Sequence, residues 1–437
     1  MSRISGSSYD SRLMGRVAET GDGSTLSLDF TTMGGTLDSR ITFSRADATE
    51  RATYINSLGY VTTVASRQDP RFDYDPITLV AKGLLLEAPS TNLLTYSQDL
   101  TQTGWFTSNI TVATSSLLSP NNIAYSSGIT ESATTTTHLL QKGTANTTAT
   151  LYTLSFWAKS GLRTQLYTSW DGGLCIAKWD LSGSTSPVAA GSNVPTLTQT
   201  AYPNGWYKLT ATYTAQAGGI YANFYTQNGS GSTYIGTGAF PGNSSAVALY
   251  IWGVQQETGL GSSYIATTTA AVTRAVDTAI IAAGSNFSSW YTGGTVGTFV
   301  SNWYGSASSA TSRSVIATSD QTTKHLHMYQ TASALTLRLA DFNAAATVTT
   351  ANSLTANALT KGAFSYASTA TSLCLNGGTV ATGTLAFTVA PTWLSIGGPS
   401  TNGTSITDTT VMLNNSIRTL KYFPARLTDG QIQGLTT

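Results

Sequence analysis

The sequence has little charge, few cysteines and no long apolar run. Charged residues make up only 10% of the 437 positions and the net charge is +1. Bulk electrostatics therefore give no reason to expect a nucleic acid or an anionic membrane as a partner. The two cysteines, Cys175 and Cys374, are too few for a disulfide framework, and we expect two buried thiols. No apolar stretch approaches the roughly 18 residues of a membrane helix, which predicts no membrane insertion.

The first residues, MSRISGSSYDSRLMGR, contain no apolar segment of the kind that a secretory signal needs. We therefore expect synthesis in a cytoplasm and, if the protein works outside a cell, an exit by another route. Residues 1–24 are polar, rich in Ser and Gly and without periodicity, which predicts an extended N-terminal arm.

Aromatic residues are plentiful, with 9 Trp, 21 Tyr and 13 Phe, and this excludes a disordered chain. They occur together with many Thr, Val and Gly residues, a composition typical of strands joined by tight turns. The clearest strand is Ala149–Lys159, where apolar residues such as Leu154 and Phe156 alternate with their neighbours. The sequence predicts an all-β protein.

The spacing of the strand signals predicts two tandem β-sandwiches behind a small, irregular N-terminal attachment region. The strand spacing of the first one suits a β-sandwich or a jelly roll. We place the boundaries as follows: an extended arm at 1–24, a charged attachment or adaptor region at 25–95, the first sandwich at 96–276 and the second at 277–437. A terminal helix is expected after Pro424, with Thr428 as its N-cap and Ile432 on its apolar side.

Charge is concentrated near the N-terminus. Twelve of the 21 acidic residues and nine of the 22 Lys and Arg residues lie before position 100. Mixed charge in a small region indicates either a solvated face or an assembly interface in which charged pairs set the register. Arg71–Ser97 marks the change from this charged part to the nearly uncharged remainder.

Three groups of segments resemble a known family. They are ITFSRADATERATYINSLGYV with RFDYDP and GLLLEAPSTNLLTYS, then IWGVQQETGLGSSYIATTTAAVTRAVD, and finally LCLNGGTVATG with IRTLKYFPARLTDGQIQGLT. In this order they resemble segments of bacteriophage tail and virion appendage proteins. The resemblance implies a carbohydrate-binding-like jelly roll at 96–276 and a concanavalin A-like (laminin G-like) lectin domain at 277–437.

The resemblance also implies partners and a location. It implies a tail fibre, spike or head fibre in the virion, a homotrimer by family expectation, and contacts with other virion proteins through residues 1–95. Host cell-surface glycans are the implied ligands.

Sugar recognition needs exposed aromatic faces beside hydrogen-bonding side chains, because a pyranose has an apolar C–H face rimmed by hydroxyls. The alternative is that such rings belong to the core or pack against a neighbouring subunit. Tyr221, Asn223 and Tyr225 share one face of a strand. The predicted glycan-binding residues are Tyr167, Trp170, Asp171, Trp179, Tyr221, Asn223 and Tyr225.

Metal ligands and catalytic groups are scarce. His325 and His327 alternate on a strand beside Lys324 without Asp or Cys nearby, so we predict no metal site. Calcium is not excluded by composition, since oxygen ligands suffice, but no recognised spacing supports the available residues, which are Asp320, Asp341, Asn343 and Asp408.

Glycoside hydrolysis needs two carboxyl groups at a fixed separation, and Asp171 with Asp180 is the one pair beside tryptophans. Glu257 and Asp277 are expected to hold structure. No GxSxG motif is present. We therefore predict no cofactor, no catalytic residues and no enzymatic activity.

Our leading hypothesis is a virion structural protein that anchors by its N-terminal region and presents lectin-like domains to glycans. Copy number would then raise the avidity of weak single sites. The alternatives are a polysaccharide depolymerase of a phage appendage and a decoration or spacer protein without a ligand.

Overall fold

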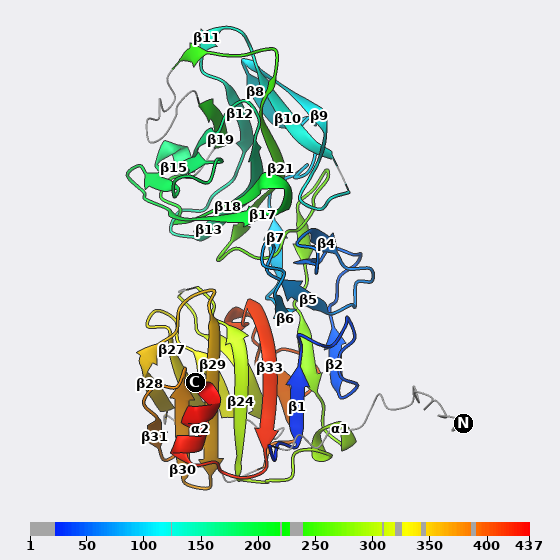
Figure 1. Ribbon diagram of the computed structural model, residues 1–437, viewed down its shortest axis with the longest axis vertical. Coiled ribbons are helices and arrows are strands. Elements are labelled where there is room, and N and C mark those ends of the chain that lie inside the picture. Colours follow the sequence, from blue (N-terminus) through cyan, green and yellow to red (C-terminus); the bar gives the residue numbers. More distant parts are fainter. Residues whose placement is uncertain are drawn as a thin grey trace, which may run out of the picture. The chain divides into compact units, whose positions relative to one another are not determined.

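The computed structural model describes residues 22–123, 125–218, 221–227, 239–307, 310–319, 326–341, 347–385 and 390–437. The all-β prediction is confirmed, because strands dominate these residues (Figure 1). Helices are restricted to α1 (Ser285–Ser288), α2 (Asp429–Thr436) and the short 3-10 turns η1 (Asp171–Gly173), η2 (Pro203–Gly205) and η3 (Thr409–Val411). None of the helices in the described ranges is long and apolar enough to cross a bilayer.

The chain forms two compact units. One unit is the continuous stretch Ser44–Asp277, and the other combines the chain up to Phe43 with Thr278–Thr437. The prediction of a separate adaptor at 25–95 is therefore wrong, since its residues belong to both units. In the discontinuous unit, β1 (Leu26–Asp29) pairs antiparallel with β33 (Asn415–Phe423) because Leu26 and Leu28 are buried in its core. Most of the predicted arm at 1–24 lies outside the described residues.

The discontinuous unit is a β-sandwich. Its first sheet has the order β31-β30-β29-β24-β33, with β1 also paired to β33, and its second sheet has the order β2-β23-β32-β25-β26-β27-β28. The further strands of the first sheet are β24 (Gly297–Tyr304), β29 (Leu359–Ala367), β30 (Ala370–Leu375) and β31 (Ala381–Gly383). Those of the second are β2 (Ile41–Ser44), β23 (Thr278–Ile281), β25 (Arg313–Ser319), β26 (Leu326–Gln330), β27 (Thr336–Asp341), β28 (Thr347–Ser353) and β32 (Trp393–Ile396).

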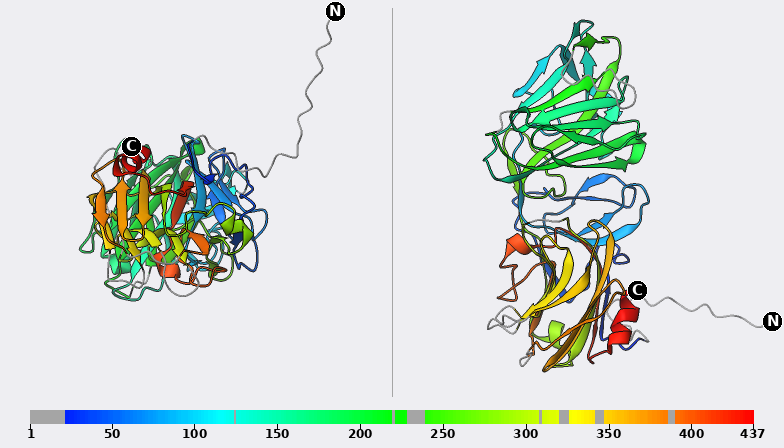
Figure 2. Two further views of the ribbon diagram at one scale, coloured as in Figure 1. Left: turned by 90° about the horizontal axis from the view of Figure 1, so that it is seen from below. Right: turned by 90° about the vertical axis from the view of Figure 1, so that its left-hand side faces the viewer.

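Helix α2 lies against β29 and β30 at the end of the chain (Figure 2). Thr428 caps it by accepting a hydrogen bond from the Gln431 backbone, and the Gln431 side chain bonds back to Thr428 N. Ile432 is buried, so the predicted cap and apolar side of this helix are confirmed. Both cysteines are buried and free, also as predicted.

The unit Ser44–Asp277 contains a second sandwich. One sheet has the order β17-β18-β13-β21-β10-β9, and the other has the order β16-β15-β14-β19-β12-β8. The first comprises β9 (Ile110–Leu118), β10 (Tyr125–Glu131), β13 (Leu151–Ser160), β17 (Thr196–Tyr202), β18 (Trp206–Thr214) and β21 (Val247–Thr258). The second comprises β8 (Trp105–Ser108), β12 (Leu139–Gly143), β14 (Gln165–Trp170), β15 (Cys175–Asp180), β16 (Val188–Ala190) and β19 (Tyr221–Gln227).

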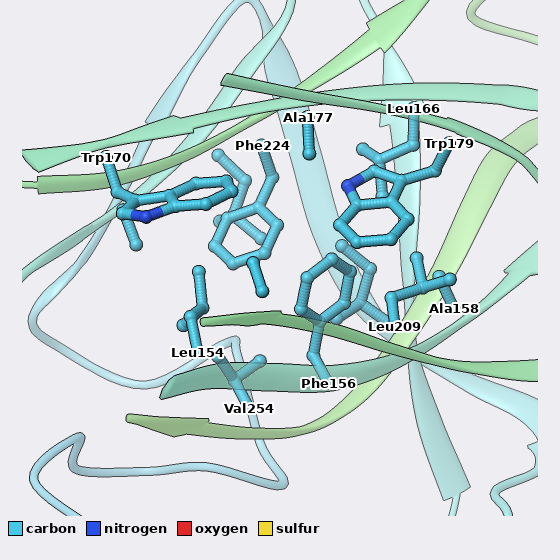
Figure 3. Packing of buried hydrophobic residues seen from close by; sticks show 14 of the residues in the cluster. Leu154, Phe156, Ala158, Leu166, Trp170, Ala177, Trp179, Leu209, Phe224 and Val254 are labelled. Carbon is cyan, nitrogen blue, oxygen red and sulfur yellow. The ribbon is translucent and has the colours of Figure 1, made fainter. Parts of the chain in front are cut away.

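Alternate side chains of the two sheets meet in one core (Figure 3). Phe156 of β13 lies edge-on to Phe224 of β19 at 5.0 Å and to Trp179 of β15 at 6.2 Å between ring centroids. These edge-to-face contacts fix which side of each strand faces inward. The opposite side of the β14/β19 sheet is therefore its outer face.

Short strand pairs complete the unit. Thr53–Ile55 (β3) and Val61–Thr63 (β4) form a hairpin whose turn covers residues 56–59, closed by a hydrogen bond from Gly59 N to Asn56 O of 2.9 Å. Gly59 has φ +82°, and a Cβ there would meet the Pro76 carbonyl, so this turn requires glycine. The remaining strands pair as β5 (Arg71–Tyr74) with β6 (Ala81–Leu86), β7 (Ser90–Asn92) with β22 (Val272–Arg274), and β11 (Thr135–Thr136) with β20 (Phe240–Pro241).

Five charged side chains are buried together in the unit Ser44–Asp277, and we call them the buried ion cluster: Arg45, Arg71, Glu87, Arg274 and Asp277. Arg71 donates to Glu87 Oε2 at 2.5 Å and also to Asp277 Oδ2. Arg45 Nε donates to Asp277 Oδ1 at 2.7 Å, and Arg274 donates to Glu87 Oε2. Both carboxylates are thus shared between two guanidinium groups.

The buried ion cluster corrects the prediction that the N-terminal charged residues form a solvated face or an assembly interface. Several of these charged residues are neither a solvated face nor an assembly interface, because they are buried inside one unit: Arg45, Asp47, Arg71, Asp73 and Glu87. Arg45, Arg71 and Glu87 each have a partner about 190 to 230 residues away in the sequence, which no local pattern reveals. Asp277 was expected to hold structure, and its contacts confirm that expectation.

Acid should weaken the cluster. Burial by itself raises the pKa of Glu87, but the charges of Arg274 and Arg71 outweigh it and lower this pKa from 4.5 to about 2. The stabilisation is therefore complete above pH 4.5 and is lost as the pH falls toward 2, by about 3 kcal/mol in the free energy of unfolding. Urea unfolding of the full chain between pH 2 and 6 measures this loss.

The matched comparison is Glu87→Gln against Glu50→Gln, since Glu50 is an exposed glutamate of the same unit. Glu87→Gln should flatten the acid dependence and lower stability at pH 7, because it leaves Arg71 and Arg274 buried with too little negative charge. Parallel pH curves for wild type and Glu87→Gln would contradict this assignment.

Candidate functional site

The outer face of the β14/β19 sheet gathers aromatic and amide side chains. Tyr167 and Ser169 of β14 point outward, as do Tyr221, Asn223 and Tyr225 of β19, because side chains alternate along each strand. Tyr167 lies opposite Tyr225 in the antiparallel register, and their rings meet edge to face with centroids 5.7 Å apart. Tyr167 is only 8% exposed, so the half-buried Tyr225 is the ring of this pair that a ligand can reach. Ser169 lies opposite Asn223.

A row of hydrogen bonds crosses the strands beside these rings. Gln141 of β12 donates from Nε2 to Asn223 Oδ1 at 2.7 Å, and Asn223 donates from Nδ2 to Ser169 Oγ at 3.2 Å. Phe106 of β8 lies opposite Gln141 and is 57% exposed, while Tyr221 is 44% exposed. We call this surface the tyrosine–amide face; it consists of Phe106, Gln141, Tyr167, Ser169, Tyr221, Asn223 and Tyr225.

The seven residues of the face carry no formal charge, and Lys178 of β15, which lies opposite Tyr167 in the register, borders them on the same side of the sheet. Burial raises the pKa of the Tyr167 hydroxyl, and the nearby Tyr225 raises it further. Burial also raises the pKa of Tyr225, against a smaller opposite effect of its hydrogen bond to Ser169. Both phenols therefore stay protonated at neutral pH and can donate as well as accept hydrogen bonds. The face offers rings, amides and hydroxyls to a ligand, without formal charge.

The structure contradicts three of the predicted glycan contacts. Trp170 is 1% exposed and Trp179 is 0% exposed, because both point into the sandwich core. Trp179 lies opposite Leu166 and donates from its indole to Thr168 Oγ1 at 2.9 Å. Buried rings cannot stack on a sugar, so the prediction is wrong for these tryptophans.

Asp171 is also structural. It is fully buried, and its carboxylate accepts bonds from Asn193 Nδ2 and from the backbone of Gln216 and Ala217, at 2.9 to 3.1 Å. Asp180 binds the Ser182 and Thr185 hydroxyls and amides of its own turn. The two carboxylates considered for hydrolysis are therefore occupied in holding loops.

Tyr167, Tyr221, Asn223 and Tyr225 do share one face, and their contact with glycan stays a prediction. Phe106, Gln141 and Ser169 were not predicted. Their strands alternate in the sequence, but only the order β8-β12-β19-β14, which is not the chain order, brings them beside Asn223. A single sequence does not specify that order.

The described residues contain no group of three His, Cys, Asp or Glu side chains placed to hold a metal ion. His327 is buried in β26, with its ring 4.8 Å from that of Tyr329. Asp408 caps a 3-10 turn by accepting from Thr410 N. Other residues considered for metal binding lie outside the described ranges, namely Asp320, Lys324, His325 and Asn343.

Comparison with known proteins gives no family. No family model matches the chain, and neither does any curated protein. Among solved structures, the chain is similar to the carbohydrate-binding module CBM40 of the Ruminococcus gnavus IT-sialidase bound to α2,3-sialyllactose, with 18% identity and a TM-score of 0.28 over 33% of this chain and 83% of that one.

Two other solved structures are similar over longer stretches. Domains LG4-5 of the mouse laminin α1 chain match at 9% identity and a TM-score of 0.24, over 68% of this chain and 91% of that one. The Trypanosoma rangeli sialidase in complex with sialic acid matches at 9% identity and a TM-score of 0.29, over 91% of this chain and 60% of that one. TM-scores this low establish no common fold, so the site rests on this chain's own geometry.

Removing one ring from each side of the sheet should give different losses of stability, because one ring lies in the core and the other on the surface. Trp179→Ala should lower the free energy of unfolding by about 3–5 kcal/mol, because it leaves a cavity beside Phe156. Tyr225→Ala should cost under about 1.5 kcal/mol, since its ring lies on the outer face. Urea unfolding of both variants measures the difference. Equal losses would contradict the assignment of inner and outer sides.

Proposed function

We propose that the unit Ser44–Asp277 binds carbohydrate through the tyrosine–amide face. The observation that carries the proposal is the hydrogen-bonded row Gln141–Asn223–Ser169 directly beside the half-buried ring of Tyr225, which the buried Tyr167 supports from the side. Rings stack on the apolar C–H face of a sugar, while amides and hydroxyls reach its rim. Exposed Phe106 and Tyr221 extend the same face beyond this centre.

The neutral chemistry of the face suits uncharged hydroxyls and predicts modest affinity at one site. The face lies on strands whose other side is locked in the core, so little ordering is needed on binding. Several copies in one assembly would raise the avidity. A homotrimer, the state implied by the sequence resemblance, would provide such copies.

We further propose that the protein is a bacteriophage virion component, a tail fibre, spike or head fibre, which presents this face to host glycans. The support is the ordered set of sequence segments that resemble phage appendage proteins. In the structure two of the three groups of segments meet: Arg45, Arg71 and Glu87 come from the first group, and Arg274 and Asp277 come from the second. Contact of residues 1–95 with other virion proteins stays a prediction.

The two alternative functions, polysaccharide depolymerase and spacer protein without a ligand, predict different results on incubation with a polysaccharide. A depolymerase would shorten a polysaccharide on incubation, and a spacer protein would bind none. Because Asp171 and Asp180 both hold loops, the unit Ser44–Asp277 offers no support for the hydrolytic pair that the sequence suggested. Binding without loss of polysaccharide chain length is the outcome that separates recognition from both rivals.

Glycan-array binding of the full chain tests the face. Tyr225→Ala and Asn223→Ala should each weaken binding by about tenfold or more, since each removes a ring or a hydrogen-bonding centre. Thr198→Ala, at an exposed position of β17 in the other sheet, should leave binding unchanged. Tyr225→Phe should retain more binding than Tyr225→Ala, because it keeps the ring. Unchanged binding by both face variants would overturn the proposal.

Antibody labelling of purified virions in the electron microscope tests the location. The expected result is labelling of a tail or head appendage, with the chain also detected by mass spectrometry of the same particles. Its absence from washed virions would reject a virion role and leave carbohydrate binding to be judged by the array alone.

A further inference from the structure

A hollow of about 590 Å³ lies at one end of the tyrosine–amide face, within the unit Ser44–Asp277. Its lining includes Leu94, Thr95, Lys142, Thr144, Tyr221 and Gln256. Tyr221 belongs both to the face and to the hollow, two positions along β19 from Asn223. Lys142 lies opposite Ala222 in the register and so belongs to the inner side of the sheet, which a ligand on the outer face reaches round the strand ends beside Tyr221. The volume is in the range of small-molecule sites.

Among the described residues that line the hollow, Lys142 is the one that carries a charge, and it is only 5% exposed. Its ammonium donates to Thr95 Oγ1 at 2.9 Å and lies 5.1 Å from the ring centre of Trp105 and 5.8 Å from that of Tyr96. Among the residues that the structure describes, no carboxylate forms a salt bridge with it. Burial lowers the pKa of Lys142, with no opposing charge to raise it.

A buried ammonium normally has an anionic partner, because removal from water penalises the charge. The buried arginines of this unit follow that rule: Arg45 contacts Asp277, Arg71 contacts Glu87 and Asp277, and Arg274 contacts Glu87. The aromatic rings around Lys142 stabilise a cation only in part. One of its three N–H groups is used by Thr95, which leaves donors for a ligand.

A second polar group in the hollow also lacks a partner. The hydroxyl oxygen of Thr144 is buried and makes no hydrogen bond within the described residues. It lies two positions after Lys142, just past the end of β12, and lines the same hollow. A hydroxyl donates readily to a carboxylate oxygen. The hollow thus combines a cation and a neutral donor, both short of acceptors.

We propose that this hollow binds the carboxylate of an acidic sugar residue, whose neighbouring residues in the glycan lie on the tyrosine–amide face. Lys142 donates to one carboxylate oxygen and Thr144 to the other, while Tyr221 contacts the ring of the same sugar. This inference rests on the proposed function and adds a ligand class to it. The seven uncharged residues of the face give no reason by themselves to prefer an acidic glycan, and Lys142→Gln separates the hollow from Lys178, the cation that borders the face beside Tyr167.

Isothermal titration of the full chain with trigalacturonate and its methyl ester tests the charge requirement. These ligands share the same sugars and differ in the carboxylate, so the acid should bind about 10- to 100-fold more tightly, the usual range for a charge-assisted hydrogen bond. 3′-Sialyllactose against lactose distinguishes a terminal acidic sugar from a uronate chain. A sulfated galactose oligomer tests whether any anion suffices.

Lys142→Gln should remove the preference for the acid, and Thr144→Val, which keeps the side-chain shape, should reduce it about threefold to tenfold. Lys159→Gln is the matched control, because Lys159 lies on β13 of the other sheet and donates to Asn204 O. Thermal unfolding of each variant verifies folding; if Lys142→Gln is unfolded, Thr144→Val and the acid–ester comparison decide. Equal binding of every acidic ligand and its neutral counterpart would overturn the proposal.

The outcomes separate the two proposals. If the wild-type protein binds acid and ester equally and Tyr225→Ala abolishes this binding, the face is supported as the site and the hollow is rejected. Acid-selective binding lost in Lys142→Gln but kept in Tyr225→Ala would support the hollow as a carboxylate site and reject the face. Absence of binding to all these ligands would count against the hollow, and the glycan array would then decide the face.

Discussion

The sandwich of residues 44–277 depends on buried salt bridges between the beginning and the end of this stretch of chain. Arg71 and Glu87, near the beginning, contact Arg274 and Asp277, at the end. Desolvation makes such a cluster costly, so its net contribution to stability is small compared with the cost of breaking it. Its main effect is on specificity: a carboxylate shared by two guanidinium groups accepts one chain arrangement and rejects shifted ones. The segment 44–95 is therefore part of the same compact unit as the sandwich and not a separate domain.

The fold class could be predicted from the sequence, because alternation and turn residues are local signals. The strand at 149–159, the hairpin turn at 56–59 and the cap at Thr428 all follow from neighbours in the chain. The role of the N-terminal charges could not. A sequence shows how many charges a region has but not whether they are buried, and partners about 200 residues away leave no periodic trace. The same limit explains the misplaced boundary: β1 pairs with β33 at the far end of the chain.

Part of the error in the predicted site could have been avoided from the spacing of residues along a single strand. Tyr167 and Trp170 are three positions apart, and in a strand an odd separation puts two side chains on opposite faces. They could not both contact one ligand, and the same parity relates the outward Tyr225 to the buried Phe224. Which face is inward depends on the opposing sheet, where Phe156 meets both Phe224 and Trp179. The residues missed, Phe106 and Gln141, required the strand order itself.

Core and site are coupled through this alternation. Each core residue of β19 lies between two residues of the tyrosine–amide face, so the packing of Phe224 fixes the positions of Asn223 and Tyr225. The hydrogen bonds through Gln141 and Ser169 then orient the Asn223 amide. A face held in this way needs little ordering when a ligand arrives, which lowers the entropic cost of binding. Selectivity must then come from the edge of the face, where the hollow beside Tyr221 contains the buried ammonium of Lys142.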